Sequence, residues 1–216
     1  SNKPARPAAP RPRKAGKGRR AVPEDADFGD NLAFALSMFA YASVGPTGPE
    51  AEGKVRRSIE RALLDAAPKI GRWELTWGPC VKKLLLVPSA INTMFVVRSL
   101  DRPELHAIGV AGTNPTSVFD WLVEDVFVAR QTPWPYAKAK APGAAIAQGT
   151  ASGLSVLQDL RPSGDRPGAG TTLEQHLAAV VSEGTRVLVT GHSLGGALSP
   201  VLAQWLADTQ GLPDKW

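Results

Sequence analysis

The chain has 216 residues with a formal net charge of +5, and its length and 43% hydrophobic content suit one sizeable hydrophobic core. Its one cysteine, Cys80, excludes an internal disulfide. No apolar run in the sequence reaches the roughly 20 residues that a transmembrane helix needs, so no transmembrane segment is expected.

The positive charge lies at the start of the chain. Residues 1–22 contain eight basic and no acidic residues, and the remainder has 17 basic against 20 acidic residues. This proline-, alanine- and lysine/arginine-rich segment predicts a disordered tail over residues 1–24, followed by one domain over residues 25–216. The tail's charge would suit nucleic acid or an anionic membrane. A solubilising or leader segment is the favoured interpretation.

The location of the protein stays open between cytoplasmic and secreted. Residues 24–27, Glu-Asp-Ala-Asp, precede the first apolar segment. An acidic stretch is the wrong flank for the apolar part of a signal peptide, so none is predicted.

The first half of the chain predicts helices and then strands. Asp30 is expected to cap the first helix, and Pro68 is expected to end the second. A turn at residues 101–103 is expected to join two strands. The predicted helices cover residues 30–42 and 55–67, and the strands cover residues 73–81 (ambiguous), 93–98 and 104–111.

The second half predicts strands that alternate with helices. Such alternation favours an α/β fold, in which helices flank a mostly parallel sheet, parallel at least in its later part. The predicted elements are a short helix over residues 117–125, a proline-rich loop over 132–143, helices over 151–160 and 172–182, a strand over 186–190 and a long helix over 194–207.

The sequence Gly191-His192-Ser193-Leu194-Gly195 fits the pattern G-x-S-x-G between that last strand and helix. The apolar residues before it predict a strand that is buried on both faces. A serine at a strand-to-helix turn adopts a strained backbone that exposes its Oγ, and glycines such as Gly195 and Gly196 leave room where strand and helix crowd together. We therefore predict that Ser193 is a nucleophile. The alternative is a serine that caps the helix in a glycine-rich turn.

Residues 191–198, Gly-His-Ser-Leu-Gly-Gly-Ala-Leu, resemble the nucleophile elbow of the class 3 lipase family, α/β-hydrolases that act on carboxylic esters. Residues 106–113 and 120–125 resemble the strand, oxyanion loop and lid of that family. The family usually has His where Gln148 stands and Arg where Ala111 stands. The resemblance covers roughly residues 30–210. It implies an α/β-hydrolase fold and lipase or esterase activity on a lipid or other ester substrate.

An oxyanion hole needs two N–H groups that point at one site. The residue after the nucleophile, Leu194, supplies one of them, and the strand end at Gly112-Thr113 is the right kind of place for the second. The family resemblance assigns this second donor to Thr113. The alternative is that Thr113 only ends a strand.

The predicted helix over residues 117–125 has Val118, Trp121 and Leu122 at spacing i, i+3 and i+4. By resemblance, this apolar face belongs to a lid that makes transient contact with a lipid interface. The alternative is that the same face packs on the protein core.

The sequence offers no base for Ser193. No histidine follows it, and the following acids are Asp208 and Asp214. Asp208 lies about 22 Å along the helix from Ser193. We expect His106 to be structural, His176 to be solvated, and His192 to pack beneath the site.

A serine without a base loses most of its catalysis. We therefore expect this chain to be the N-terminal part of a serine ester hydrolase, inactive by itself, whose triad Asp and His lie beyond Trp216. The strand over residues 186–190 would then be an exposed sheet edge.

The sequence leaves two other classes of function to consider. The first is a catalytically inactive lipase-fold protein or truncated gene product that binds lipid or a partner. The second is a nucleic-acid-associated protein, which is not expected because the body is slightly acidic and contains no known binding motif. The sequence shows no phosphate-binding loop and no cluster of metal ligands, so no cofactor and no metal are expected.

Overall fold

The computed structural model describes residues 29–39, 49–83, 91–112, 130–137, 141 and 143–210. The predicted tail, the predicted helix over residues 117–125, and the residues Thr113, Val118, Trp121 and Leu122 lie outside these ranges.

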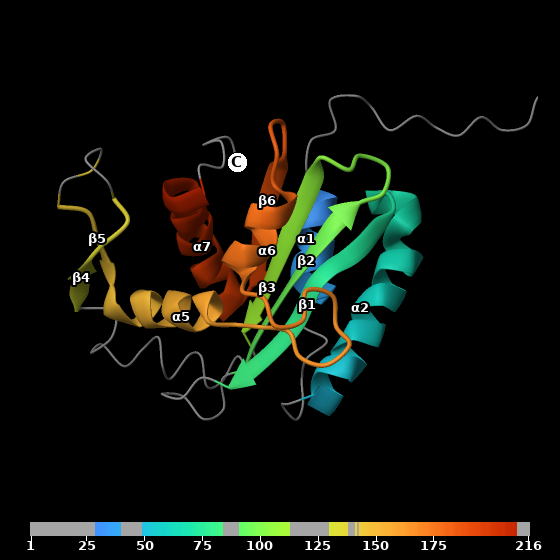
Figure 1. Cartoon of the computed structure of the whole chain (residues 1–216), viewed down its shortest axis with the longest axis horizontal. Helices are drawn as coiled ribbons and strands as arrows, with labels where there is room; N and C mark the ends of the chain where they lie inside the picture. Colours follow the sequence, from blue (N-terminus) through green and yellow to red (C-terminus); the bar gives the residue numbers. More distant parts are fainter. Residues whose placement is uncertain are drawn as a thin grey trace, which may run out of the picture.

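The centre of the structure is a four-stranded sheet with the order β1-β2-β3-β6 (Figure 1). Its strands are β1 (Trp73–Lys83), β2 (Ile91–Ser99), β3 (Leu105–Gly112) and β6 (Arg186–His192). The pairs β1–β2 and β2–β3 are antiparallel, and β3–β6 is parallel. A separate antiparallel pair consists of β4 (Gln131–Pro133) and β5 (Ala145–Ala147).

Helices cover both faces of the sheet. One hydrophobic cluster joins the sheet to α1 (Asp30–Phe39) and α2 (Pro49–Ile70), and the other joins it to α5 (Gln148–Gln158), α6 (Leu173–Val180) and α7 (Leu194–Gln210). Successive side chains of a strand point to opposite faces. Accordingly, Phe95 and Val97 of β2 pack in the first cluster, and Met94 and Val96 pack in the second.

The expected α/β architecture is confirmed, and several boundaries differ from the prediction. The described sheet is mixed and not mostly parallel as expected, because parallel pairing occurs only between β3 and β6 and the short turn after β2 makes β3 run antiparallel to it. The predicted loop over residues 132–143 begins inside a short strand, β4, and β6 continues to His192.

The predicted end of the second helix at Pro68 is wrong, because α2 continues through Pro68 to Ile70. Proline removes the N–H that would bond to the carbonyl four residues earlier, here that of Leu64. Leu64 lies on the solvent side of α2, where its side chain is 72% exposed. Water can therefore satisfy this carbonyl, and the buried residues Val55, Ile59 and Leu63 keep the helix against the sheet.

β6 ends the sheet on the side away from β1, and no described strand pairs with its second edge. A groove runs along this edge between β6 and α7, and Val189, Gly191, Ser199 and Ala203 are among the residues that line it. In the described part of the chain, no helix has the length and apolar character to cross a membrane.

Candidate active site

Ser193 is the single residue between β6 and α7. Its φ of 57° is positive, and no other non-glycine residue in the described ranges has a positive φ. An L-residue in this left-handed region carries a strain of about 1–2 kcal/mol. The residue is exposed to solvent. The backbone of Ser193 therefore agrees with the strained serine that the sequence pattern predicts at this turn.

Glycines permit the tight packing around this turn. A side chain at Gly191 would overlap the carbonyl of Gly195 and the Oγ of Ser199, and a side chain at Gly195 would overlap the carbonyl of Val110 in β3. At Gly196, a Cβ would lie 3.2 Å from the carbonyl oxygen of Gly191. The first turn of α7 is therefore in direct contact with the ends of β3 and β6.

Leu194 begins α7 and lies beside the end of β3. Its side chain is 3% exposed, and a Cβ added to Gly112 would be 2.5 Å from the Leu194 Cβ. The first N–H groups of a helix have no partner within the helix, and the helix dipole makes this end partly positive. The structure thus brings the N–H of Leu194 to the elbow and places Gly112 next to it. Thr113 follows Gly112 but lies outside the described residues.

His106 and His192 lie at opposite ends of the β3–β6 pair. His192 is the last residue of β6, is partly buried and pairs in register with Ala111. His106 is buried near the start of β3 and pairs with Val187, six residues before Ser193. At about 3.3 Å per strand residue, His106 is roughly 20 Å from the elbow. This position agrees with the expectation that His106 has a structural role.

His176 differs from the expectation of a solvated side chain. It is partly buried, and its Nε2 lies 3.4 Å from the Oγ1 of Thr76 in β1. Burial, with a smaller contribution from nearby His106, lowers the pKa of His176 to about 4. Burial also lowers the pKa of His106, with a contribution from Arg98. The sequence pattern missed this burial because α6 presents His176 to a strand distant in sequence.

Asp208 lies at the far end of α7 from Ser193. Its carboxylate accepts a hydrogen bond from the indole Nε1–H of Trp134 at 2.7 Å and another from the amide of Gln204 at 3.1 Å. Trp134 follows β4, so the carboxylate attaches the β4–β5 hairpin to the last turns of α7. Asp208 therefore has a structural partner and does not approach the elbow.

The single cysteine and the possible metal ligands of the described ranges were the remaining candidates for a site. Cys80 is buried in β1, and this burial raises the pKa of its thiol. Among the described residues, no group of three or more His, Cys, Asp or Glu side chains is arranged to hold a metal ion.

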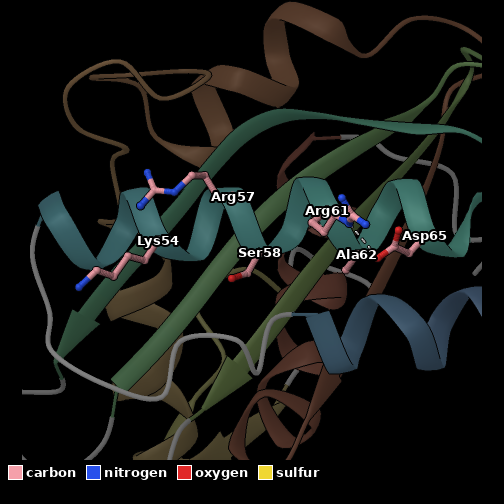
Figure 2. Close-up of a pocket in the computed structure, with 6 residues that line it drawn as sticks. All are labelled: Lys54, Arg57, Ser58, Arg61, Ala62 and Asp65. Atoms are coloured by element: carbon pink, nitrogen blue, oxygen red, sulfur yellow. Dashed lines mark hydrogen bonds and ion pairs between the residues drawn. The ribbon is translucent and has the colours of Figure 1, made fainter.

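A shallow surface on α2 carries Lys54, Arg57, Arg61 and Asp65 (Figure 2). Three of these side chains take part in exposed ion pairs along the helix, which are Lys54–Glu50 at 3.0 Å and Arg61–Asp65 at 3.1 Å. α2 packs on β1, at the opposite edge of the sheet from β6. We interpret this surface as a solvated, charged helix face.

The family model for class 3 lipases, described as "Lipase (class 3)", matches residues 107–214. The chain belongs to the class 3 lipase family. The matched stretch begins in β3, includes the elbow and extends beyond α7, so it contains Ser193 and the described residues around it.

This chain is similar to M37 lipase, whose crystal structure matches it with a TM-score of 0.71 and 32% sequence identity. The similarity covers 86% of this chain and 56% of M37 lipase, so the chain spans little more than half of that protein's length. No curated protein matches the chain. The predicted family and α/β-hydrolase-like fold are confirmed.

Sequence reasoning missed two polar side chains beside the elbow. The hydroxyl of Thr190 donates to the carbonyl of Ala33 at 3.0 Å and ties β6 to α1. Ser199 is buried in α7, and its hydroxyl donates to the carbonyl of Gly195 at 2.6 Å. The position of Ser199 in a helix segment that also contains the apolar residues Leu198 and Val201 was the signal that could have predicted its burial.

Proposed function

We propose that this class 3 lipase family chain is part of a carboxylic ester hydrolase in which Ser193 is the nucleophile. The observation that carries the proposal is the exposed Ser193 at a φ of 57° between β6 and α7. The Oγ of Ser193 attacks the ester carbonyl and passes its proton to a base. The alcohol leaves with a proton, and water then hydrolyses the acyl-enzyme.

The N–H of Leu194 is one donor to the oxyanion in this proposal. It lies at the N-terminus of α7, where an unpaired N–H and the helix dipole both favour negative charge. Thr113 supplies the second donor by family resemblance. The contact between Gly112 and Leu194 supports this pairing, because it brings the chain that leads to Thr113 next to the elbow.

Neither His106 nor Asp208 serves Ser193 as base or acid in this proposal. His106 lies roughly 20 Å from Ser193 along the strands. Asp208 lies about 22 Å away along α7 and bonds to Trp134. The substrate class is a lipid or other carboxylic ester, which the family and the similarity to M37 lipase support.

The test compares ester turnover by the 216-residue chain and by the whole product of its gene, with p-nitrophenyl butyrate as substrate. We expect turnover in the whole product and a loss of at least about 10³-fold in Ser193→Ala. Ser152→Ala is the matched control, because Ser152 lies on α5 and bonds to the carbonyl of Gln148.

Undiminished turnover in Ser193→Ala would show that another group is the nucleophile. If the whole product has no ester turnover, the proposed activity is wrong, and a non-catalytic lipase-fold protein that binds lipid or a partner is favoured.

A further inference from the structure

A buried hydroxyl lies directly behind the elbow. Ser199 is 6% exposed and sits six residues after Ser193, in the second turn of α7. Its Oγ lies next to Gly191, in the space that a side chain at position 191 would occupy. The hydroxyl donates to the carbonyl of Gly195 at 2.6 Å. Ser199 therefore contacts both the end of β6 and the first turn of α7.

Two hydrogen bonds link this hydroxyl to the N–H of Leu194. The carbonyl of Gly195 and the N–H of Gly196 belong to one peptide group. That N–H donates to the carbonyl of Ser193 at 2.9 Å. The carbonyl of Ser193 and the N–H of Leu194 belong to a second peptide group, the one between these two residues. The series therefore runs from the Ser199 hydroxyl through two peptide groups and ends on the Leu194 N–H.

Hydrogen bonds in such a series polarise one another, by about 10–30% per bond. A donor to the Gly195 carbonyl makes the N–H of Gly196 more acidic, and the same effect passes through Ser193 to the N–H of Leu194. A hydroxyl that bonds to a carbonyl four residues earlier also adjusts the local helix geometry. Both effects act on the peptide groups next to Ser193.

We infer that Ser199 is a positioning residue for the oxyanion donor, and that its hydroxyl orients and polarises the N–H of Leu194. The inference rests on the proposed function. A donor contributes most to catalysis when it is held in place before the charge develops, which a buried hydrogen-bond series achieves. Ser199 acts through the backbone and does not touch the substrate.

The same type of bond elsewhere provides a matched control. On α7, the hydroxyl of Thr209 donates to the carbonyl of Trp205 at 2.7 Å, far from the elbow. Ser199→Ala and Thr209→Val each remove one such hydroxyl from the same helix. Each carbonyl keeps the N–H partner that an α-helix supplies, so both variants are expected to fold.

The first measurement is the amide proton chemical shift of Leu194 in the 216-residue chain. We expect Ser199→Ala to move the Leu194 and Gly196 amide protons upfield, and Thr209→Val to leave both in place. Ser199→Cys should give an intermediate shift, because a thiol is a weak donor. An unchanged Leu194 shift in Ser199→Ala overturns the inference.

The second measurement is ester turnover by the whole gene product. We expect Ser199→Ala to lower kcat about threefold to tenfold with KM unchanged, a smaller loss than removal of a whole oxyanion donor. Thr209→Val should keep the parent kcat. An unchanged kcat in Ser199→Ala, or an equal loss in Thr209→Val, overturns the inference.

The two proposals fail in different ways. Turnover that survives in Ser193→Ala, or is absent from the parent, overturns the proposed function, and this inference falls with it. Turnover that needs Ser193 but does not respond to Ser199→Ala overturns this inference alone.

Discussion

The side chain of Leu194 packs against the backbone of Gly112, so closely that a Cβ on Gly112 would lie 2.5 Å from the Leu194 Cβ. Leu194 directly follows Ser193, and Gly112 ends β3. The contact therefore joins the elbow to a strand that is distant in sequence. Since Leu194 is buried, it cannot move out to make room for a larger residue.

Gly112→Ala should destabilise the protein by about 1–3 kcal/mol, because the added methyl group must displace Leu194 or the end of β3. Urea unfolding followed by circular dichroism measures this loss. Gly53→Ala is the control. A Cβ at Gly53 in α2 would meet its nearest atom at 3.8 Å, so alanine should stabilise this helix by about 0.5–1 kcal/mol. Equal stability of the two variants would contradict the contact between Gly112 and Leu194.

Ser193→Gly should be more stable than Ser193→Ala by about 1 kcal/mol. Glycine adopts a positive φ without strain, and alanine keeps the strain of the left-handed backbone. For a chain of this size, the difference corresponds to about 2–4 °C in Tm, which thermal unfolding resolves. The same pair of substitutions at Ser152, inside helix α5, should give the opposite order. A preference for alanine at both positions would argue against a left-handed Ser193.

Acid should destabilise the fold through His176. Its pKa is about 4 in the folded protein and near 6.5 when it is unfolded, so the unfolded chain binds more protons between these values. The contribution of His176 to stability is complete above pH 6.5 and is lost as the pH falls toward 4. The lowered pKa of His106 acts in the same direction.

Urea midpoints at pH 7 and pH 5 measure this effect, and His176→Gln should reduce the difference between them. The lowered pKa values of Glu50 and Glu104 matter only below about pH 4.5, so they do not obscure this range. A pH dependence that is unchanged in His176→Gln would assign it to other groups.

Asp208→Ala should lower stability and leave ester turnover by the whole gene product unchanged. The substitution removes the charge-assisted hydrogen bond from Trp134, which contributes about 1.5–3 kcal/mol. Trp134→Phe removes the donor of the same bond and should cause a similar loss. A tenfold fall in kcat with Asp208→Ala at full stability would instead give Asp208 a role in catalysis.

Local sequence signals predicted the elbow well. The apolar residues before Gly191 and the helical pattern after Ser193 indicated the strand and the helix that meet there, and the family followed from the same stretch. A strained backbone at Ser193 was also expected, because the motif places it at a strand-to-helix turn, and its positive φ agrees with this expectation.

Predictions were weaker where the outcome depended on distant partners. The end of α2 depends on the solvent exposure of the helix side near Pro68 and on packing against the sheet, which a helix-breaking rule does not include. The burial of His176 depends on the contact of α6 with Thr76 in β1.

The sequence by itself determined the α/β class, the family and the position of Ser193, because periodicity and glycine placement act over a few neighbouring residues. Tertiary structure alone decided that β1 pairs with β2, that Gly112 meets Leu194, and that Ser199 lies buried behind the elbow. These relationships arise from close packing between segments far apart along the chain, and no local pattern encodes which of those segments come into contact.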